Sequence, residues 1–322
     1  MKKKITAIFL CISMLMLTAC EMLSLGADSG ELVLATGGTD GTYFAVGGSM
    51  ATVLNPLLKK SSISVLSTGG SKSNINMLSS KEAQLAIVQN DVMYYAYTGT
   101  DLFQDEGKYT RFSAIAGLYD ETVQIVTCND NIKTIEDLKG KKVCVGDAGS
   151  GTEFNARQIL DAYGMSFDDI EVVNASFGDS TDNLADGKLD AAFMVAGTPT
   201  KAVAELAARK NIRLIGIDDS HIEKIQSKYQ FYSSATIESG TYENVDEDVQ
   251  TVSMRAVLVA SNDVRESEVN EILTNLFDKK DDLAKEQTKF NELSLEDAVK
   301  DISIPFHAGA KKYYEKQGIS GL

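Results

Sequence analysis

The chain has 322 residues and a formal net charge of −15 at neutral pH, with 46 acidic residues against 31 basic ones. This length is enough for two modest domains, and the acidic balance argues against nucleic acid or an anionic membrane face as a partner. The two histidines, His221 and His307, lie far apart without metal-ligand spacing, so the sequence predicts no structural zinc site and no cofactor.

The first 19 residues have the features of a lipoprotein signal peptide. A lysine-rich start precedes an apolar run over 5–17, and the letters LTAC then end at Cys20. A plain signal peptide or an anchor helix is the alternative, although the run is short for a membrane span. We expect residues 1–19 to be removed, Cys20 to carry lipid and residues 20–30 to form a flexible tether. Loss of three lysines and no acid then changes the net charge from −15 to −18.

Three units of strand, polar loop and helix follow. Apolar runs at 31–35, 63–66 and 84–88 are predicted strands, and each precedes a loop rich in glycine or polar residues. The first loop spans 36–48, and the helix after it is predicted over 49–60, where Pro56 kinks it or marks its end. Two further helices are predicted, over 71–80 and from residue 89 onward, with Asp91 as the N-cap of the latter. This alternation predicts a parallel sheet whose ligands bind at the carboxyl ends of the strands.

Two β-rich segments are interpreted as crossings between domains. Residues 113–118 and 122–127 are predicted strands separated by a break at 119–121, and residues 249–260 form a long β-rich return. Amphipathic helices near the carboxyl end are predicted to pack back on the first domain, over 268–277, 282–290 and 295–302. The sequence therefore predicts a discontinuous first lobe, residues 31–119 with 250–322, and a second lobe over residues 120–249.

A strand, a glycine loop and a helix recur in the second lobe. The segment GKKVCVGDAGSGT at 140–152 is predicted to place a strand before a turn, and residues 153–163 to form the helix. Backbone N–H groups and the positive end of the helix dipole suit an anion there. The alternative is that Ser150 or Thr152 only caps the helix. The remaining predictions for this lobe are strands at 170–175, 189–196, 212–217 and 229–237, and helices at 180–184 and 200–210.

Some local features leave two interpretations open. Pro199 is expected in the first turn of the helix over 200–210. Cys128 and Cys144 lie on predicted strands, where they form either a disulfide or two buried thiols. Paired acids such as Asp168-Asp169 and Asp218-Asp219 are interpreted as helix caps rather than catalytic pairs.

The sequence contains no recognisable catalytic motif. It lacks a Gly-x-Ser-x-Gly elbow and a His-Glu-x-x-His motif, and the glycine loop at 149–152 lacks the lysine of a Walker loop. Several polar glycine loops at strand ends in two domains instead favour a ligand cleft between two lobes.

Eight segments in order resemble one family. They are ATGGTDGTYFAVGG (35–48), STGGSKSNINML (67–78), LAIVQNDVMYYAYTG (85–99), IAGLYDETVQIV (115–126), DLKGKKVCVGDAGSGTEFNAR (137–157), LADGKLDAAFMVAGTP (184–199), VQTVSMRAVLVASNDV (249–264) and IPFHAGAKKYYEKQG (304–318). Together they resemble the TAXI-type solute-binding proteins of TRAP (tripartite ATP-independent periplasmic) transporters. Ala308, where proline is expected, and Asn90, where serine is common, depart from the pattern; Asn90 lies at the expected cleft edge.

The resemblance implies a fold and a function. The expected fold is α/β, a two-lobed type II periplasmic-binding-protein-like fold with a mainly parallel sheet and flanking helices in each lobe. The expected protein is an extracytoplasmic, lipid-anchored binding protein that takes a small anionic or zwitterionic ligand, glutamate or a related dicarboxylate. It would deliver this ligand to a membrane permease driven by an ion gradient. A partner of a membrane sensor and an extracytoplasmic enzyme acting on a small acid remain the alternatives.

The resemblance also implies a set of ligand-binding residues. They are Gly41, Thr42, Tyr43, Ser71, Asn74, Gln89, Asp91, Tyr119, Ser150, Gly151, Thr152, Asn155, Gly197 and Pro199. The strongest candidates are Ser150 to Thr152. A core position is the alternative for Tyr43, a cap or hinge hydrogen bond for Asp91, and a surface or interlobe charge for Arg157. Tyr119 is expected at a hinge.

Overall fold

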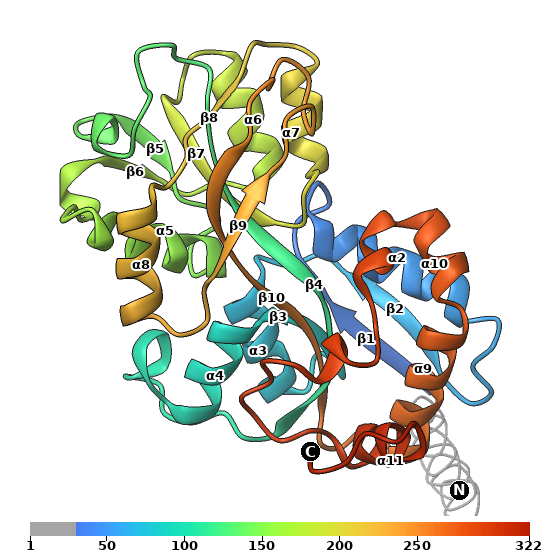
Figure 1. Cartoon of the computed structure of the whole chain (residues 1–322). Helices are drawn as coiled ribbons and strands as arrows, with labels where there is room; N and C mark the ends of the chain where they lie inside the picture. Colours follow the sequence, from blue (N-terminus) through green and yellow to red (C-terminus); the bar gives the residue numbers. More distant parts are fainter. Residues whose placement is uncertain (1–29) are drawn as a thin grey trace, which may run out of the picture.

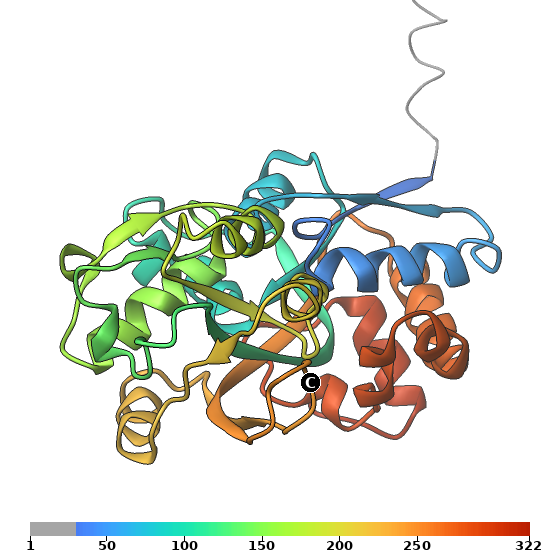
Figure 2. The ribbon, with the colours of Figure 1, turned by 90° about the horizontal axis from the view of Figure 1, so that it is seen from above.

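A computed structural model describes residues 30–322 of the chain, so the predicted signal peptide, Cys20 and the tether before Gly30 lie outside the described residues. Within that range, ten strands form one mixed sheet in the order β2-β1-β3-β10-β4-β7-β5-β6, with β8 paired to β4 and β9 to β10. Helices surround this sheet (Figures 1 and 2). None of the helices in residues 30–322 is both long and apolar enough to cross a bilayer.

One end of the sheet consists of parallel strands, each followed by a helix. Strand β1 (Glu31–Ala35) lies between β2 (Ser62–Leu66) and β3 (Leu85–Gln89), and helices α2 (Thr42–Leu54), α3 (Ser71–Ser80) and α4 (Asn90–Thr98) follow them. The three predicted strand–loop–helix units are therefore confirmed. Helix α2 begins at Thr42 rather than at residue 49, and it ends before Pro56.

Two details at this end differ from the prediction. Two glycines of the predicted loop, Gly47 and Gly48, lie inside α2. Gly47 lets the helix pack closely on the sheet, because a Cβ there would lie 2.7 Å from Thr36 Cγ2. Asp91 is not the N-cap of α4, since Gln89 occupies that position. The Oδ1 atom of Asp91 instead accepts a hydrogen bond from Val92 N at 2.6 Å.

Strands β4 and β10 connect the two ends of the molecule. Strand β4 (Phe112–Thr127) is continuous, so the predicted break at 119–121 is wrong. Its antiparallel partner β10 (Val249–Ser261) pairs across that point, with Arg255 opposite Asp120, and supplies the backbone hydrogen bonds that keep the strand extended. Figure 1 shows the two strands side by side through the centre of the molecule. The predicted return strand is confirmed.

The other end again combines parallel strands with helices. Strands β5 (Lys142–Cys144), β6 (Glu171–Val173) and β7 (Ala191–Ala196) are joined by α5 (Gly151–Ala162) and α6 (Phe177–Ala185), and α7 (Lys201–Ala207) follows β7. Three shorter elements complete this end: β8 (Arg213–Leu214), α8 (Asp219–Lys228) and β9 (Ser233–Ile237). Helix α8 was not predicted.

Three local predictions at this end have a clear outcome. Pro199 does not lie in the first turn of α7, because Thr200 is the N-cap and Pro199 precedes it after a cis peptide bond. Cys128 and Cys144 are free thiols, so the disulfide is wrong. Asp218 caps α8 through a bond from His221 N, as expected for a solvated acid at a helix start.

The carboxyl-terminal helices pack on the first end of the sheet. They are α9 (Glu266–Asp278), α10 (Lys280–Glu286) and α11 (Ala308–Lys316); α9 and α10 pack against α2, and α11 packs against α9 and β4 (Figure 1). The predicted helix over 295–302 is wrong, because this segment contains only a short 3-10 turn, Asp297–Val299. Other such turns span Asp101–Phe103, Glu136–Leu138, Phe167–Asp169 and Thr288–Glu292.

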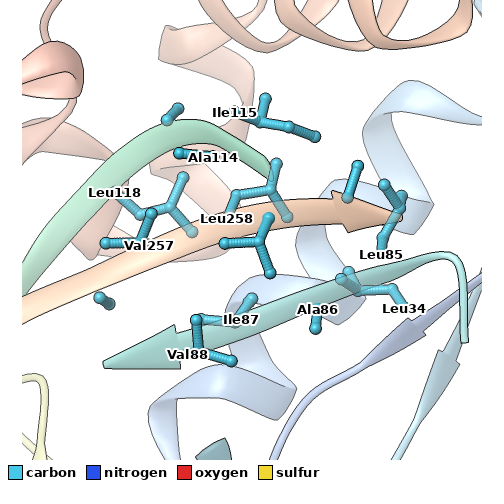
Figure 3. Close-up of a cluster of buried hydrophobic side chains, with 14 of the residues drawn as sticks. Leu34, Leu85, Ala86, Ile87, Val88, Ala114, Ile115, Leu118, Val257 and Leu258 are labelled. Atoms are coloured by element: carbon cyan, nitrogen blue, oxygen red, sulfur yellow. The ribbon is translucent and has the colours of Figure 1, made fainter. Parts of the chain in front are cut away.

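Buried apolar side chains form two separate regions. The first core draws on residues 32–119 and 256–314, together with Phe154, and Figure 3 shows its centre, where Leu85, Ile87 and Val257 lie on neighbouring strands. The second core comprises two clusters within residues 123–254. Chain segments far apart in sequence therefore share the first core, while the second core is nearly continuous in sequence.

Candidate functional site

A cavity of about 360 Å³ lies where the loops of both cores meet. Its walls come from the loops after β1, β2, β5 and β6 and from the ends of β3 and β7, which is the carboxyl edge of the parallel strands. The lining residues are Gly37 to Tyr43, Ser67 to Ser71, Gln89, Glu121, Asp147, Ser150 to Thr152, Ser176 to Gly178, Val195 and Ala196.

The first residues of helices α2 and α3 line the cavity. Each begins after a glycine, Gly41 or Gly70, which has no side chain to cap the helix, and the Thr68 hydroxyl accepts a hydrogen bond only from Gly70 N, at 3.1 Å. The first N–H groups of a helix have no partner within the helix, so those of Thr42, Tyr43 and Ser71 stay available. N–H groups of this kind, together with the helix dipoles, suit a carboxylate group.

The start of α5 is capped in part by its own side chains, while the N–H groups of Gly151 and Thr152 have no partner among residues 30–322. Ser150 Oγ accepts a hydrogen bond from Glu153 N at 3.1 Å, and Gly149 N donates to Glu153 Oε2 at 2.6 Å. Ser150 is therefore a helix cap, the alternative that the sequence left open. Thr152 lines the cavity, and its hydroxyl has no recorded hydrogen bond to any residue in the described range.

Glu121 lies in the cavity wall on the central strand β4. Its side chain is 2% exposed, and the Tyr43 hydroxyl donates a hydrogen bond to Oε1 at 2.5 Å. Burial raises the pKa of the Glu121 carboxyl to about 8, with a smaller contribution from the charge of Asp91, because low-dielectric surroundings disfavour the charged form. The Tyr43 hydroxyl opposes the shift by stabilising the carboxylate.

The lining is acidic. Asp40, Glu121 and Asp147 contribute carboxyl groups, and the lining within residues 30–322 includes no lysine, arginine or histidine. Burial also raises the pKa of Asp147, and the charge of Asp179 adds to this effect. Two like charges 4 Å apart repel each other by about 4 kcal/mol at an effective dielectric constant of about 20. A ligand with a second negative charge near Glu121 is therefore disfavoured unless a proton accompanies it.

Polar contacts across the cavity join the two cores at its rim. Lys201 Nζ lies 2.9 Å from Asp40 Oδ1, and Thr42 Oγ1 donates to the Gly197 carbonyl at 3.3 Å. The ion pair is solvent-exposed, so it contributes little stability by itself. These contacts enclose the cavity between residues of both cores.

A buried network behind the cavity also spans the cores. Gln89 Nε2 donates to Asn155 Oδ1 at 3.1 Å, and Asn155 Nδ2 donates to Asp91 Oδ2 at 3.1 Å. Burial raises the pKa of the Asp91 carboxyl to about 6, against the lowering effect of its bonds to Val92 and Asn155. Asp91 thus accepts a hydrogen bond from a residue of α5, and its expected role at a hinge stays a prediction.

The structure separates the predicted site residues into two groups. Those that line the cavity are Gly41, Thr42, Tyr43, Ser71, Gln89, Ser150, Gly151 and Thr152. The others, Asn74, Asp91, Tyr119, Asn155, Gly197 and Pro199, lie outside the lining.

Several residues outside the lining have structural contacts instead. Asn74 is fully buried and binds the carbonyls of Thr36 and Ile87, so it fixes the ends of β1 and β3. Tyr119 is buried on β4, and its hydroxyl has no hydrogen-bond partner in residues 30–322. Arg157 stacks on the Phe167 ring, with 4.1 Å between its guanidinium carbon and the ring centroid.

Sequence reasoning missed the residues that give the cavity its charge. Glu121 stood within an interpreted break between strands, and Asp40 and Asp147 stood within loops where acidic residues are common. Phe177 was not singled out either, yet its ring lines the wall at the start of α6. Only the pairing of β4 with β10 reveals that Glu121 is buried. Asn90 is also buried, and its Oδ1 accepts a hydrogen bond from Arg255 N at 3.3 Å rather than lining the cavity.

Comparison with solved structures shows the class of fold. The periplasmic binding protein BugD matches with a TM-score of 0.55 at 11% identity, covering 81% of this chain and 86% of that one. A protein from Bordetella bronchiseptica RB50 matches with a TM-score of 0.54 at 16% identity, covering 89% of each chain. The predicted type II periplasmic-binding-protein-like fold is confirmed.

A family comparison places the chain more narrowly. Residues 34–318 match the model of the NMT1-like family, and the chain belongs to that family. The periplasmic aliphatic sulphonate binding protein SsuA from Escherichia coli is also similar, with a TM-score of 0.49 at 16% identity over 89% of this chain and 82% of that one.

Proposed function

We propose that this protein is an extracytoplasmic solute-binding lipoprotein of the TAXI type. It captures a small carboxylate or amino acid, such as glutamate or a related dicarboxylate, and delivers it to a TRAP permease. The observation that supports this most is the cavity of about 360 Å³ enclosed by strand-end loops of both cores. A volume of this size suits a small metabolite, and the fold is that of periplasmic binding proteins.

The two cores are proposed to be lobes that close on the ligand. Residues 31–119 and 250–322 form the first lobe, and residues 120–249 form the second. The strands β4 and β10 cross between the cores, which makes them the natural hinge. Contacts such as Lys201 to Asp40 and Thr42 to Gly197 then belong to the closed state.

The ligand's carboxylate is proposed to bind the open starts of α2 and α3, with Thr152 adding a hydroxyl from the second lobe. This assignment adds the starts of α2 and α3 to the donors expected at Ser150 to Thr152, where the Ser150 hydroxyl caps α5 by accepting from Glu153 N. Cys20, outside the described residues, is proposed to hold the protein at the membrane through lipid.

A thermal-stability panel tests the binding proposal. Glutamate, glutamine, 2-oxoglutarate, C4-dicarboxylates, neutral sugars and divalent metals are each added to the purified mature protein. A ligand at a hundred times its dissociation constant should raise the free energy of unfolding by about 2.7 kcal/mol. Thr152→Ala should weaken binding of the acid that stabilises the protein most, whereas Thr152→Ser should retain this binding. A response to sugars or metals alone would contradict the proposal.

The delivery step needs a separate test. A gene for a TRAP permease next to this one, and uptake of the bound acid only when both proteins are present, would support transport. An adjacent sensor kinase without a permease would instead favour the sensory role.

A further inference from the structure

The unassigned feature of the cavity is the buried carboxyl group of Glu121. It lines the cavity from β4, where the Tyr43 hydroxyl donates to Oε1 and the Gln89 side chain also stabilises the carboxylate by hydrogen bonding. A carboxylate has about four acceptor sites, so Glu121 retains the capacity to accept hydrogen bonds from a ligand. Its position on the central strand fixes it more firmly than a loop would.

No basic side chain of the lining within residues 30–322 neutralises this group. Lysines near the cavity already have acidic partners: the Nζ atoms of Lys72, Lys201 and Lys289 lie 2.6 Å from Glu106, 2.9 Å from Asp40 and 2.6 Å from Glu292. The positive partner of Glu121 must therefore be a proton or the ligand itself. A buried carboxylate without a counter-charge is unfavourable, so a cationic group on the ligand would relieve a cost present in the empty cavity.

Gln89, whose side chain neighbours the Glu121 carboxyl, provides a second sign of a ligand donor. Its side chain is 2% exposed and lines the cavity, its Nε2 is bound to Asn155, and its Oε1 has no hydrogen-bond partner among residues 30–322. Most buried side-chain acceptors are paired in folded proteins. Glu121 and Gln89 together leave acceptors unfilled on the same wall, and a ligand N–H group suits both.

We propose that Glu121 determines specificity by binding a protonated nitrogen of the ligand, so that the cavity takes amino acids in preference to carboxylic acids that lack an amine. The inference rests on the proposed binding function and narrows its substrate class. The carboxylate of the amino acid lies at the starts of α2 and α3. There the N-cap glycines have no side chain, so the backbone N–H groups of Thr42, Tyr43 and Ser71 stay available. The amine lies at Glu121. The two poles thus match the two charges of a zwitterion.

Binding of such a ligand also releases a proton. The titratable and charged groups around Glu121 are Tyr43, Tyr119, Asp91 and Asp120, and of these Asp120 is paired with Arg255 at 3.0 Å. Burial raises the pKa of Glu121 to about 8, so its carboxyl is mostly protonated in the empty cavity at pH 7. An ammonium group stabilises the ionised form, and the displaced proton passes to the buffer.

Matched ligand pairs test the inference by titration calorimetry. The pairs are L-glutamate with glutarate, L-aspartate with succinate, and L-leucine with 4-methylpentanoate, which differ by the amine alone. The wild-type protein should bind the amine-bearing member of at least one pair ten or more times more tightly. Glu121→Gln should remove most of this preference, whereas Glu296→Gln, at an exposed position outside the lining, should keep it.

Proton release gives a readout that needs no variant. Titrations at pH 7 in buffers of different ionisation enthalpy should show close to one proton released per bound amino acid, and release should be lost in Glu121→Gln. Equal affinity for the deaminated acids, or an unchanged preference in Glu121→Gln, would overturn the inference while the proposed function stands. If only sugars or metals bind, both fail.

Discussion

Replacing Glu121 by glutamine should stabilise the ligand-free protein, and the gain should depend on pH. The carboxyl has an ordinary pKa of 4.5 in the unfolded chain and about 8 in the folded protein. Between these values the folded state binds more protons than the unfolded state, so wild-type stability falls as pH rises through that window. Glutamine does not titrate, and its amide oxygen still accepts the hydrogen bond from Tyr43.

The size of the effect follows from the pKa difference. One pKa unit corresponds to about 1.4 kcal/mol, and pH 7 lies about 2.5 units above the unfolded value. Glu121→Gln should therefore match the wild type near pH 4.5 and exceed it by about 3 kcal/mol at pH 7. Water that enters the cavity would reduce this figure, which makes it an upper bound. Asp91, whose pKa burial raises to about 6, is common to both proteins and largely cancels.

Chemical denaturation at a series of pH values measures the effect. Unfolding curves of ligand-free protein at pH 4.5, 6, 7 and 8 give the free energy for the wild type, Glu121→Gln and the control Glu296→Gln. The control changes the same atoms at an exposed position, so its stability should follow the wild type at each pH. A Glu121→Gln protein that is less stable at pH 7, or whose offset is independent of pH, would refute the reasoning.

Three further changes test individual contacts. Gly151→Ala places a Cβ 1.8 Å from Gln89 Oε1, so it should weaken ligand binding measured by calorimetry. The control Gly48→Ala adds a Cβ with no atom within 4 Å and should bind the ligand normally. Equal affinities of the two variants would contradict this prediction. Ser150→Ala removes the cap of α5 and should cost about 0.5–2 kcal/mol in thermal unfolding, and unchanged stability would show that the cap contributes nothing. Cys20→Ala should move the protein from the membrane fraction to the soluble fraction. A variant that stays in the membrane fraction as the wild type does would contradict the lipoprotein proposal.

The sequence by itself determined the repeated strand–loop–helix units. Apolar runs such as 84–88 are long enough to cross a sheet once, and glycine and polar residues after them end the strand, so the signal is local. The return strand β10 was equally clear, because its segment is long, rich in valine and free of glycine and proline. The order of these units, with a late strand returning to the first domain, also predicted two lobes with a discontinuous first lobe.

Tertiary structure decided which local signals prevailed. Gly47 suggested a loop, yet it lies in α2 because close packing on Thr36 requires the absence of a side chain. Residues 119–121 suggested a break, yet β10 supplies their backbone partners and keeps β4 extended. Backbone pairing and close packing between distant segments leave no mark in a single stretch of sequence.

The chemistry of the site depended most on the fold. Glycine loops showed where helices begin, but only the structure showed that the Ser150 side chain caps α5 at Glu153 N, while the N-cap residues of α2 and α3 make no side-chain cap. Glu121 is one of 46 acidic residues, and nothing in its neighbours distinguishes it. Its charge matters because segments far apart in sequence exclude water around it, and desolvation is a property of the folded surroundings rather than of the residue.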